Sequence, residues 1–356
     1  MSGSFTICHV NVARNYRGGE RQTELLIREL ARRGYRQVLV CRRGQPLGQR
    51  FADIDLDIRL VSGNPIGVAR AAHGTDVLHI HEGRSVYAAY LRWLVLKTPY
   101  VITRRVNNPI REHRWAHQTY QNAACVACVA PQVAEIVSAY DAGINVKVVH
   151  SGSSGFVADL SEVAKLRKQW QGKFLVGHVG ALDNAQKGQE YIIAVARQFQ
   201  VIDPQVHFLL VGGGEDEQVL RELASGLSNL TFVGFVDNVG DYLAALDLFI
   251  LPSNREGIGS ILFDAMEQRL AIVASSVGGV PDIVHDGENG KLIEPRSVDQ
   301  LRDAIVLLRS DPQLREQMGR AGAEIASQYT ASAMSEKYID IYQAALGGGH
   351  FADSTE

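Results

Sequence analysis

The stretch FTICHVNVARNYRGGERQTELLIRELARRGYRQVLVC, residues 5–41, sets the pattern for the whole chain. Its first part, Phe5–Val12, is a short apolar run and predicts a strand. Glu20–Arg33 repeats leucines at helical spacing and predicts a helix with one apolar face. Gln37–Cys41 predicts the next strand. A strand–helix–strand order of this kind is typical of a parallel sheet covered by helices.

The same alternation continues through the first half of the chain and starts again in the second. Between the halves, the small residues of Ser151–Gly155 predict a hinge or linker. We therefore expect an α/β protein with two Rossmann-like domains. The further predicted strands are Val77–Ile80, Tyr100–Thr103, Cys125–Ala130, Val146–His150, Phe174–Gly180, Val206–Val211, Leu230–Val233, Asp247–Leu251 and Ala271–Ala274. The predicted helices of the second half are Gly188–Gln200, Asp216–Leu223 and Gly259–Glu267.

The C-terminal quarter is predicted to be helical. Ser297 opens a segment with capping-box spacing, and Asp311 precedes a proline at a first helical position. A final helix is expected from about Ala331 to Leu346, because three glycines follow it. The predicted divisions of the chain are 1–153, 154–330 and 331–348, with a flexible tail over 349–356.

Length and composition exclude several classes of protein. The 356 residues favour two domains, and 46% hydrophobic with 21% charged residues is the composition of an ordinary globular protein. No apolar run approaches the roughly 18 residues of a membrane-spanning helix, and Met1–Val12 lacks the features of a secretory signal. We therefore expect a cytoplasmic location. Four cysteines are too few for a disulfide scaffold, and the pair Cys125 and Cys128 is expected to pack inside a strand.

The charges of the two halves are opposite. Residues 1–150 hold 20 Lys+Arg against 11 Asp+Glu, a net charge of +9, which leaves 16 against 28, or −12, for residues 151–356. A basic half suggests a polyanionic partner such as an anionic membrane surface, a phosphorylated glycan or a nucleic acid. For Arg28–Arg36, a solvated helix face is an equal alternative. Nucleic acid is set aside, since the chain shows neither aromatic residues interleaved with basic ones nor a known module.

Three loops after predicted strands carry candidate binding residues, because ligands of such sheets bind where strands give way to helices. Gly18 and Gly19 precede the first helix, where they let backbone amides approach an anion or else form a plain tight turn. Lys187 precedes a glycine at a helix start, where it either suits a diphosphate or is an exposed surface lysine. Glu256 and Asp264 flank a glycine-containing loop, and carboxylates accept hydrogen bonds from sugar hydroxyls. Either acid taken alone is explained equally by a helix N-terminal acid or a solvated aspartate. Together these features indicate a sugar nucleotide.

These loops and their neighbours resemble glycosyltransferase family 4, a retaining group with the GT-B fold. The resemblance covers almost all of the chain and implies two facing Rossmann-like domains with parallel sheets. The N-terminal domain would bind the acceptor and the C-terminal domain the nucleotide-sugar donor, and the C-terminal helix would cross back to the N-terminal domain. The stretches that carry the resemblance are Asp247–Ser253, Glu256–Gly259, Ala274–Asp282, Asp286–Gly290 and Glu294-Pro295, supported by Gly18–Glu20, Asp76–His81, Val211–Gly214 and Phe232–Phe235.

The resemblance also implies roles for single residues. Lys187 and Glu256 would be catalytic: Lys187 would neutralise the diphosphate, and Glu256 would contact the transferred sugar. Asp264 would hold the nucleotide ribose. The donor-binding residues that it implies are Gly18, Gly19, Gly257, Ile258, Gly259, Ser260, Asp264 and Phe235. Candidate contacts to the acceptor or the diphosphate are His81, Arg84, Arg104 and Arg105. No metal ligand and no cofactor is expected, since cationic side chains and helix ends can replace a magnesium ion.

The chain departs from the family pattern at four places. One is at or next to Arg269, where the family usually has glycine. Ala181 stands where the family often has an arginine, and Asp264 stands where it usually has glutamate. Many members have a histidine where this chain reads Thr103-Arg104-Arg105. An arginine there favours an anionic acceptor or adds a second contact to the diphosphate.

The expected activity is transfer of a hexose-type sugar, with retention, from a nucleoside diphosphate sugar to a glycan or lipid-linked acceptor. UDP is the favoured nucleotide, and lipopolysaccharide or surface-polysaccharide synthesis at the inner face of the cell membrane is the expected setting. Two alternatives remain open at this stage. One is a catalytically weak sugar-nucleotide binding protein, and the other is a sugar-nucleotide epimerase on the same scaffold.

Overall fold

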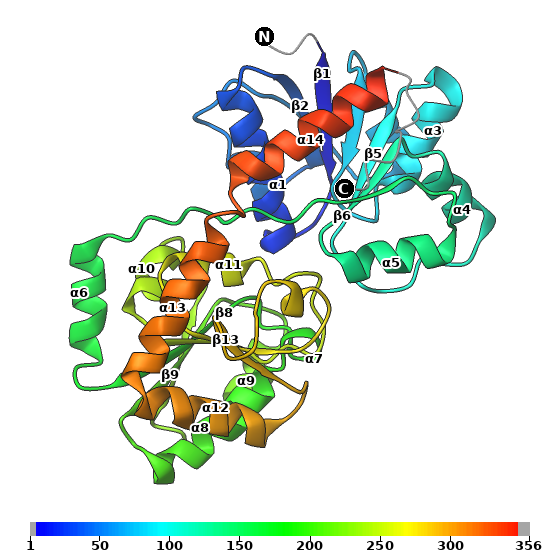
Figure 1. Cartoon of the computed structure of the whole chain (residues 1–356). Coiled ribbons are helices and arrows are strands. Elements are labelled where there is room, and N and C mark those ends of the chain that lie inside the picture. The colour runs from blue at the N-terminus through cyan, green and yellow to red at the C-terminus, as the bar shows by residue number, and fades with distance from the viewer. Residues whose placement is uncertain (1–4, 348–356) are drawn as a thin grey trace. The chain divides into compact units, whose positions relative to one another are not determined.

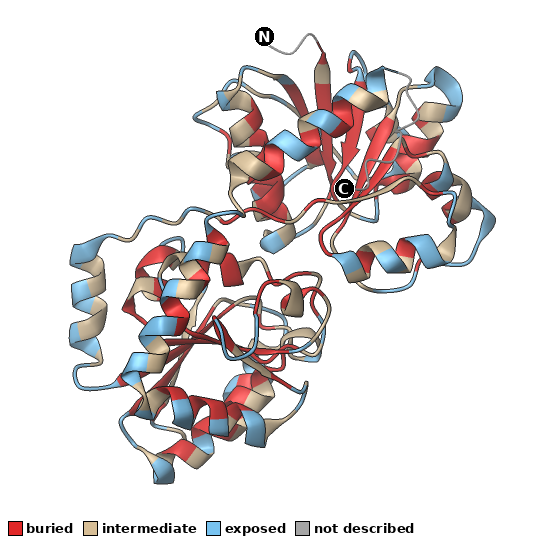
Figure 2. Ribbon diagram, in the orientation of Figure 1, coloured by how far each residue is buried: buried red, intermediate tan, exposed pale blue. Residues whose placement is uncertain are grey.

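The computed structural model describes residues 5–347 and divides into two compact units (Figure 1). Unit 1 contains the residues up to Gly152 together with those from Ala331 onward. Unit 2 is Ser153–Thr330. The tail predicted at 349–356 lies outside the described residues. Each unit has its own parallel sheet, with buried central strands and with helices around it (Figure 2).

Unit 1 is built on a seven-stranded sheet in the order β3-β2-β1-β4-β5-β6-β7. Each strand pairs in parallel with its neighbour. The strands are β1 Thr6–Asn11, β2 Arg36–Arg42, β3 Asp57–Val61, β4 Val77–Ile80, β5 Tyr100–Arg104, β6 Cys125–Cys128 and β7 Val146–Val148. The helices are α1 Gly18–Arg32, α2 Pro65–Ala71, α3 Val86–Leu96, α4 Arg114–Gln121, α5 Pro131–Tyr140 and α14 Ala331–Leu346, with a short 3₁₀ turn at Pro46–Gln49.

Unit 2 repeats this architecture with a six-stranded parallel sheet in the order β10-β9-β8-β11-β12-β13. Its strands are β8 Phe174–Val179, β9 Val206–Val211, β10 Leu230–Gly234, β11 Leu248–Leu251, β12 Ile272–Ser275 and β13 Gly290–Ile293. Its helices are α6 Leu160–Gln169, α7 Asn184–Lys187, α8 Gln189–Ile202, α9 Glu217–Leu223, α10 Val239–Ala245, α11 Ile261–Glu267, α12 Val298–Ser310 and α13 Pro312–Ala326, with a 3₁₀ turn at Val280–Asp282. The prediction of two Rossmann-like domains is confirmed.

The strand order of each sheet reverses once, and this decides where ligands can bind. In unit 1 the chain moves outward from β1 to β3 and then places β4 on the other side of β1. In unit 2 it moves from β8 to β10 and then places β11 on the other side of β8. The loops after the two central strands therefore diverge at the carboxyl edge of each sheet, which is the usual binding position in doubly wound folds.

The C-terminal helix α14 belongs to unit 1, as predicted, although the rest of the C-terminal quarter lies in unit 2. It packs against α1, β4 and β5 (Figure 1). Tyr338 and Tyr342 of α14 are buried in the unit 1 core. The Tyr342 hydroxyl lies 2.6 Å from His79 Nδ1, and the Tyr338 hydroxyl lies 2.7 Å from Thr103 Oγ1. The helix is thus held by buried polar contacts as well as by apolar packing.

Several predicted details are wrong. Helix α1 begins at Gly18, so Gly18 and Gly19 form its first turn rather than a turn before it, with Arg17 at the N-cap. Helix α11 begins at Ile261 instead of Gly259. The Ser151–Gly155 segment does join the two units, since unit 1 ends at Gly152 and unit 2 begins at Ser153. It is nevertheless packed, because Ser151 and Ser153 are buried and the Ser153 backbone amide donates to Tyr329 O at 2.6 Å. Small residues permit flexibility, but here they permit close packing.

The buried histidines of unit 1 predict a loss of stability in acid. Burial lowers the pKa of His9 to about 3 and the pKa values of His79 and His81 well below their usual range. The unfolded chain takes up these protons near the ordinary histidine pKa of about 6.5, whereas the folded chain takes them up only at much lower pH. The free energy of unfolding is therefore highest above about pH 6.5 and decreases as the pH falls toward 3. We expect urea denaturation to show a loss of about 1.4 kcal/mol or more between about pH 7.5 and 5.5. The control variant is His285→Asn, which changes a half-exposed histidine outside this cluster. A constant free energy of unfolding over this range would contradict the prediction.

Candidate active site

Lys187 and Glu256 meet at the carboxyl edge of the unit 2 sheet, where the strand order reverses. Lys187 ends the short helix that follows β8, and Glu256 lies in the loop that follows β11. Lys187 Nζ donates to Glu256 Oε1 at 2.5 Å, and Ser253 Oγ donates to the same oxygen at 2.8 Å. The side chains are 17% and 5% exposed, respectively. Two residues predicted to be catalytic thus form one ion pair in a partly buried position.

Backbone packing holds the two loops together. Gly188 has a φ of +66°, and a Cβ at this position would lie 2.4 Å from Pro252 O. The Asn254 amide donates to Gln186 O at 2.8 Å. Only a glycine allows this approach without strain, so the Lys187-Gly188 sequence is explained by the fold itself. The lysine is positioned by its neighbours before any ligand binds.

A second glycine contact shapes the Glu256 loop. Gly278, after β12, has a φ of +53°, and a Cβ there would lie 2.0 Å from Glu256 O. The next amide, of Gly279, donates to Gly257 O at 2.8 Å. The segment between Glu256 and α11 therefore packs against the loop that follows β12. This segment holds the predicted donor-binding residues Gly257, Ile258, Gly259 and Ser260. The sequence of either loop alone could not predict this contact between them.

Asp264 lies in the first turn of α11. It is buried, and its Oδ1 accepts a hydrogen bond from the Ser154 amide at 2.5 Å. Nearby, Ser153 Oγ donates to Glu267 Oε1 at 2.5 Å. Hydrogen bonds thus hold the first residues of unit 2 against α11. Asp264, which was predicted to contact a ribose, already has a hydrogen-bond partner within the protein.

Phe235 follows β10 and is 65% exposed, which is a large exposure for an aromatic ring. The loops beside it approach closely, because Gly212 has a φ of +133° and a Cβ there would lie 2.0 Å from Gly180 O. An exposed ring at the carboxyl edge of a sheet offers a stacking surface for a planar group. Its position is compatible with the predicted contact to the donor.

The remaining predicted residues lie in unit 1. Gly18 and Gly19 open α1, and Arg84 is exposed after β4. The Arg104 guanidinium is held by the Tyr120 hydroxyl at 3.2 Å and by Asn108 O. Arg105 instead lies against α1, since a Cβ on Gly19 would be 3.5 Å from Arg105 Cδ. Burial lowers the pKa of Arg105, while Tyr338 and Glu20 oppose that shift.

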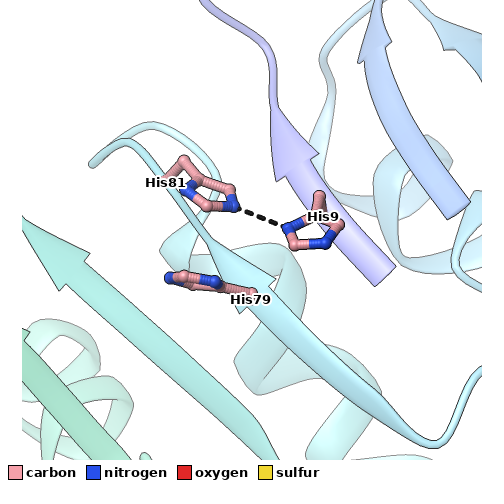
Figure 3. Close-up of side chains that lie close together, drawn as sticks. All are labelled: His9, His79 and His81. Carbon is pink, nitrogen blue, oxygen red and sulfur yellow. Dashed lines mark hydrogen bonds between the residues drawn. The ribbon is translucent and has the colours of Figure 1, made fainter. Parts of the chain in front are cut away.

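His81 belongs to a cluster that the sequence did not reveal. His9 of β1 joins His79 and His81 of β4, and their ligand-type nitrogen atoms lie within 4.8 Å of one another (Figure 3). The parallel pairing of β1 with β4 places His9 beside His79. A prediction of this strand order would therefore have brought the histidines together. Three imidazoles are a possible metal set. Hydrogen bonds to Gln37, Tyr342, Thr103 and between His9 and His81 already engage five of the six ring nitrogens.

Part of the basic charge of unit 1 is neutralised within the unit. Arg28 binds Glu24 and Asp53, and Arg33 binds Glu29 and Glu336. The arginines of α1 are therefore largely paired on the helix surface, as the solvated-face alternative expected.

Cys125 and Cys128 are buried, and burial raises the pKa of each thiol to about 12, as expected of cysteines packed in a strand.

Two family models match this chain. "Glycosyltransferase Family 4" matches residues 16–153, and "Glycosyl transferases group 1" matches residues 173–311. Alpha-maltose-1-phosphate synthase of Mycolicibacterium smegmatis is 27% identical over 320 residues, covering 78% of this chain and 81% of that protein. The lipopolysaccharide core biosynthesis glycosyltransferase LpsE of Rhizobium meliloti is 26% identical over 228 residues, covering 62% and 65%.

Solved structures of other proteins have the same fold. Anabaena Alr3699/HepE, determined in complex with UDP-glucose, superposes with a TM-score of 0.84 at 21% identity over 96% of this chain and 100% of that one. The two Rossmann-like units and the returning helix are the GT-B fold. The chain belongs to glycosyltransferase family 4. Within residues 5–347, no helix is both long and apolar enough to cross a membrane.

The close contact at Gly278 predicts a large effect of one added methyl group. In Gly278→Ala the new Cβ would collide with Glu256 O, so the loop must shift or the backbone must change conformation. We expect the variant to lose about 2 kcal/mol or more of unfolding free energy. Gly287→Ala is the matched control, since its φ of +81° faces open space and should cost only about 1 kcal/mol. Equal losses in urea denaturation would show that the contact does not constrain the loop.

Proposed function

We propose that this glycosyltransferase moves a hexose-type sugar, with retention, from a nucleoside diphosphate sugar to a glycan or lipid-linked acceptor. The observation that carries the proposal is the Lys187–Glu256 pair at the point where the unit 2 strand order reverses. A cation and a carboxylate side by side suit a ligand that joins a diphosphate to a hydroxyl-rich sugar. UDP is the favoured nucleotide.

The ion pair would exchange its partners when the donor binds. The Lys187 ammonium turns from Glu256 to the diphosphate, and the Glu256 carboxylate accepts hydrogen bonds from sugar hydroxyls. As the bond between the anomeric carbon and the phosphate oxygen breaks, negative charge grows on the departing phosphate, and Lys187 stabilises it. The acceptor oxygen attacks from the same face, and its proton passes to that phosphate. No carboxylate nucleophile is required.

Other residues would complete the donor site. The backbone amides of Gly257–Ser260 meet the diphosphate and the sugar, and Phe235 offers its exposed ring to the nucleotide base. Asp264 would hold the ribose while it keeps the Ser154 amide, since a carboxylate can accept several hydrogen bonds. Within unit 1, Gly18 and Gly19 lie at the positive end of α1, which suits an anionic group such as a phosphate.

Relatives support the choice of donor and setting. HepE has been determined with UDP-glucose bound, and LpsE is named for lipopolysaccharide core biosynthesis. The basic sequence of residues 1–150 suits an acceptor at an anionic surface, so we assign the reaction to surface-glycan synthesis at the inner face of the membrane. No metal is proposed, because Lys187 and the amides can balance the charge of the diphosphate.

A panel of nucleotide sugars tests the donor site. UDP-glucose, GDP-mannose and ADP-glucose are compared by thermal shift on the wild type and on Glu256→Gln. One donor, expected to be the UDP sugar, should raise the melting temperature, and the rise should shrink in the variant because the neutral amide binds hydroxyls less strongly. The control is Glu162→Gln, an exposed acid of unit 2. If no nucleotide sugar stabilises the protein, the proposal loses its basis.

Lys187→Ala should lower turnover by about 10²-fold or more, because it removes charge stabilisation of the leaving group. Release of UDP from the bound donor is the measurement, and circular dichroism checks the fold. Lys165→Ala, which removes an exposed lysine of the same unit, should keep normal turnover. EDTA should leave the wild-type rate unchanged. Near-normal turnover of Lys187→Ala would remove the catalytic assignment. Conversion of the donor to an epimeric nucleotide sugar, with no acceptor and no net UDP release, would point to epimerisation.

A further inference from the structure

The last turn of α3 leaves apolar side chains in water. Leu94, Val95 and Leu96 stand at three consecutive positions, and all three are exposed, Val95 to 79%. Arg92, the only charged residue of α3, is buried and donates to Ala69 O at 3.3 Å, so it does not shield this end. A run of exposed consecutive apolar residues is disfavoured on a protein surface unless it has a function.

Aromatic rings extend this apolar surface from α3 to α4. The two helices pack against each other (Figure 1). The ring of Tyr90 stacks on Trp93 with centroids 5.8 Å apart, and it meets Trp115 of α4 edge-on at 6.0 Å. Trp115 is itself 56% exposed. We name this area the α3–α4 surface; it consists of Trp93, Leu94, Val95, Leu96 and Trp115.

Three basic residues border the α3–α4 surface: Lys97, Arg111 and Arg114. Lys97 Nζ lies 3.9 Å from the centroid of the Trp93 ring. Arg114 directly precedes Trp115 at the start of α4. All three are exposed, and within residues 5–347 none of them forms a salt bridge. Unlike the paired arginines of α1, these cations are free to meet an anionic partner.

We propose that the α3–α4 surface docks unit 1 on an anionic lipid membrane. The aliphatic side chains enter the boundary between head groups and acyl chains, and the two tryptophans lie at the level of the head groups. The three cations attract the anionic lipids. The inference rests on the proposed function, which assigns the reaction to the inner face of the membrane, and it names the surface that makes the contact.

The geometry favours a membrane over a protein partner. Successive helical residues are rotated by about 100°, so the side chains of residues 94–96 point in three directions around the end of α3. A fluid apolar phase accepts all three directions, whereas a protein would need a matching groove. The charge also fits, because Glu112 is the only acid within 86–97 and 111–115. With 11 residues, α3 suits a position at the membrane surface.

Flotation of the full chain with vesicles measures the binding. Phosphatidylcholine vesicles are compared with vesicles that contain about one-third phosphatidylglycerol. The wild type should bind the anionic vesicles, and more weakly as the salt concentration rises. Val95→Ser/Leu96→Ser should bind them about ten-fold or more weakly, because less apolar surface leaves water. The matched control is Val201→Ser, since Val201 is 88% exposed on α8 of unit 2 and should not contribute.

The electrostatic part has its own variant. Arg114→Gln should weaken binding to the anionic vesicles about five-fold, as expected for one cation near a charged surface. Lys168→Gln, which removes an exposed charge from α6 of unit 2, should bind like the wild type. Equal affinities of these two variants would show that the cations beside Trp115 do not face the lipid, and would overturn the proposed orientation.

Thermal shifts with nucleotide sugars, measured on the same proteins, separate this inference from the proposed function. If the wild type binds no vesicles, or if Val95→Ser/Leu96→Ser binds them equally well, the docking surface is wrong, while stabilisation by a donor would still support the unit 2 site. Vesicle binding without stabilisation by any donor would have the opposite meaning. A wild-type dimer in sedimentation velocity that the double variant lacks, with no vesicle binding, would assign the surface to a second copy and overturn the proposal.

Discussion

The parallel pairing of strands is the constraint on which the chemistry of this molecule depends. When strands run in parallel, every carboxyl end lies at the same edge, and a reversal of strand order opens a gap between the loops that follow. In unit 2 this constraint brings Lys187 to Glu256, across 69 positions of sequence, at 2.5 Å. In unit 1 it brings His9 to His81 across 72 positions, at 3.0 Å. Neither meeting depends on local sequence.

Glycines turn this topology into a defined geometry. Gly188, Gly212 and Gly278 each have a positive φ, and each lies where another backbone passes too close for a Cβ. Their common effect is to press the loops after β8, β9, β11 and β12 against one another. A site built in this way needs little rearrangement when a ligand arrives, so binding energy is not spent on ordering the loops.

The accuracy of the sequence predictions depended on whether the deciding interactions were local. Helix α14 covers the predicted residues Ala331–Leu346, and Ser297 and Asp311 cap their helices, because a cap needs only the next three residues. The beginning of α11 was misplaced, since Gly259 takes a φ of +69° in the loop instead of entering the helix. The junction at Ser151–Gly155 was recognised from its small residues, but its packing was not, because its partners, such as Glu267, are distant in sequence.

The sequence by itself determined the alternation of strands and helices, the two Rossmann-like units, the family and the residue types of the candidate donor site, because apolar periodicity and short motifs record these directly. Only the tertiary structure decided that Lys187 and Glu256 pair, that Asp264 already holds the Ser154 amide, and that His9 completes a histidine cluster. The physical reason is that hydrogen bonds and ion pairs depend on distances of a few ångströms between atoms that topology, not sequence neighbourhood, brings together.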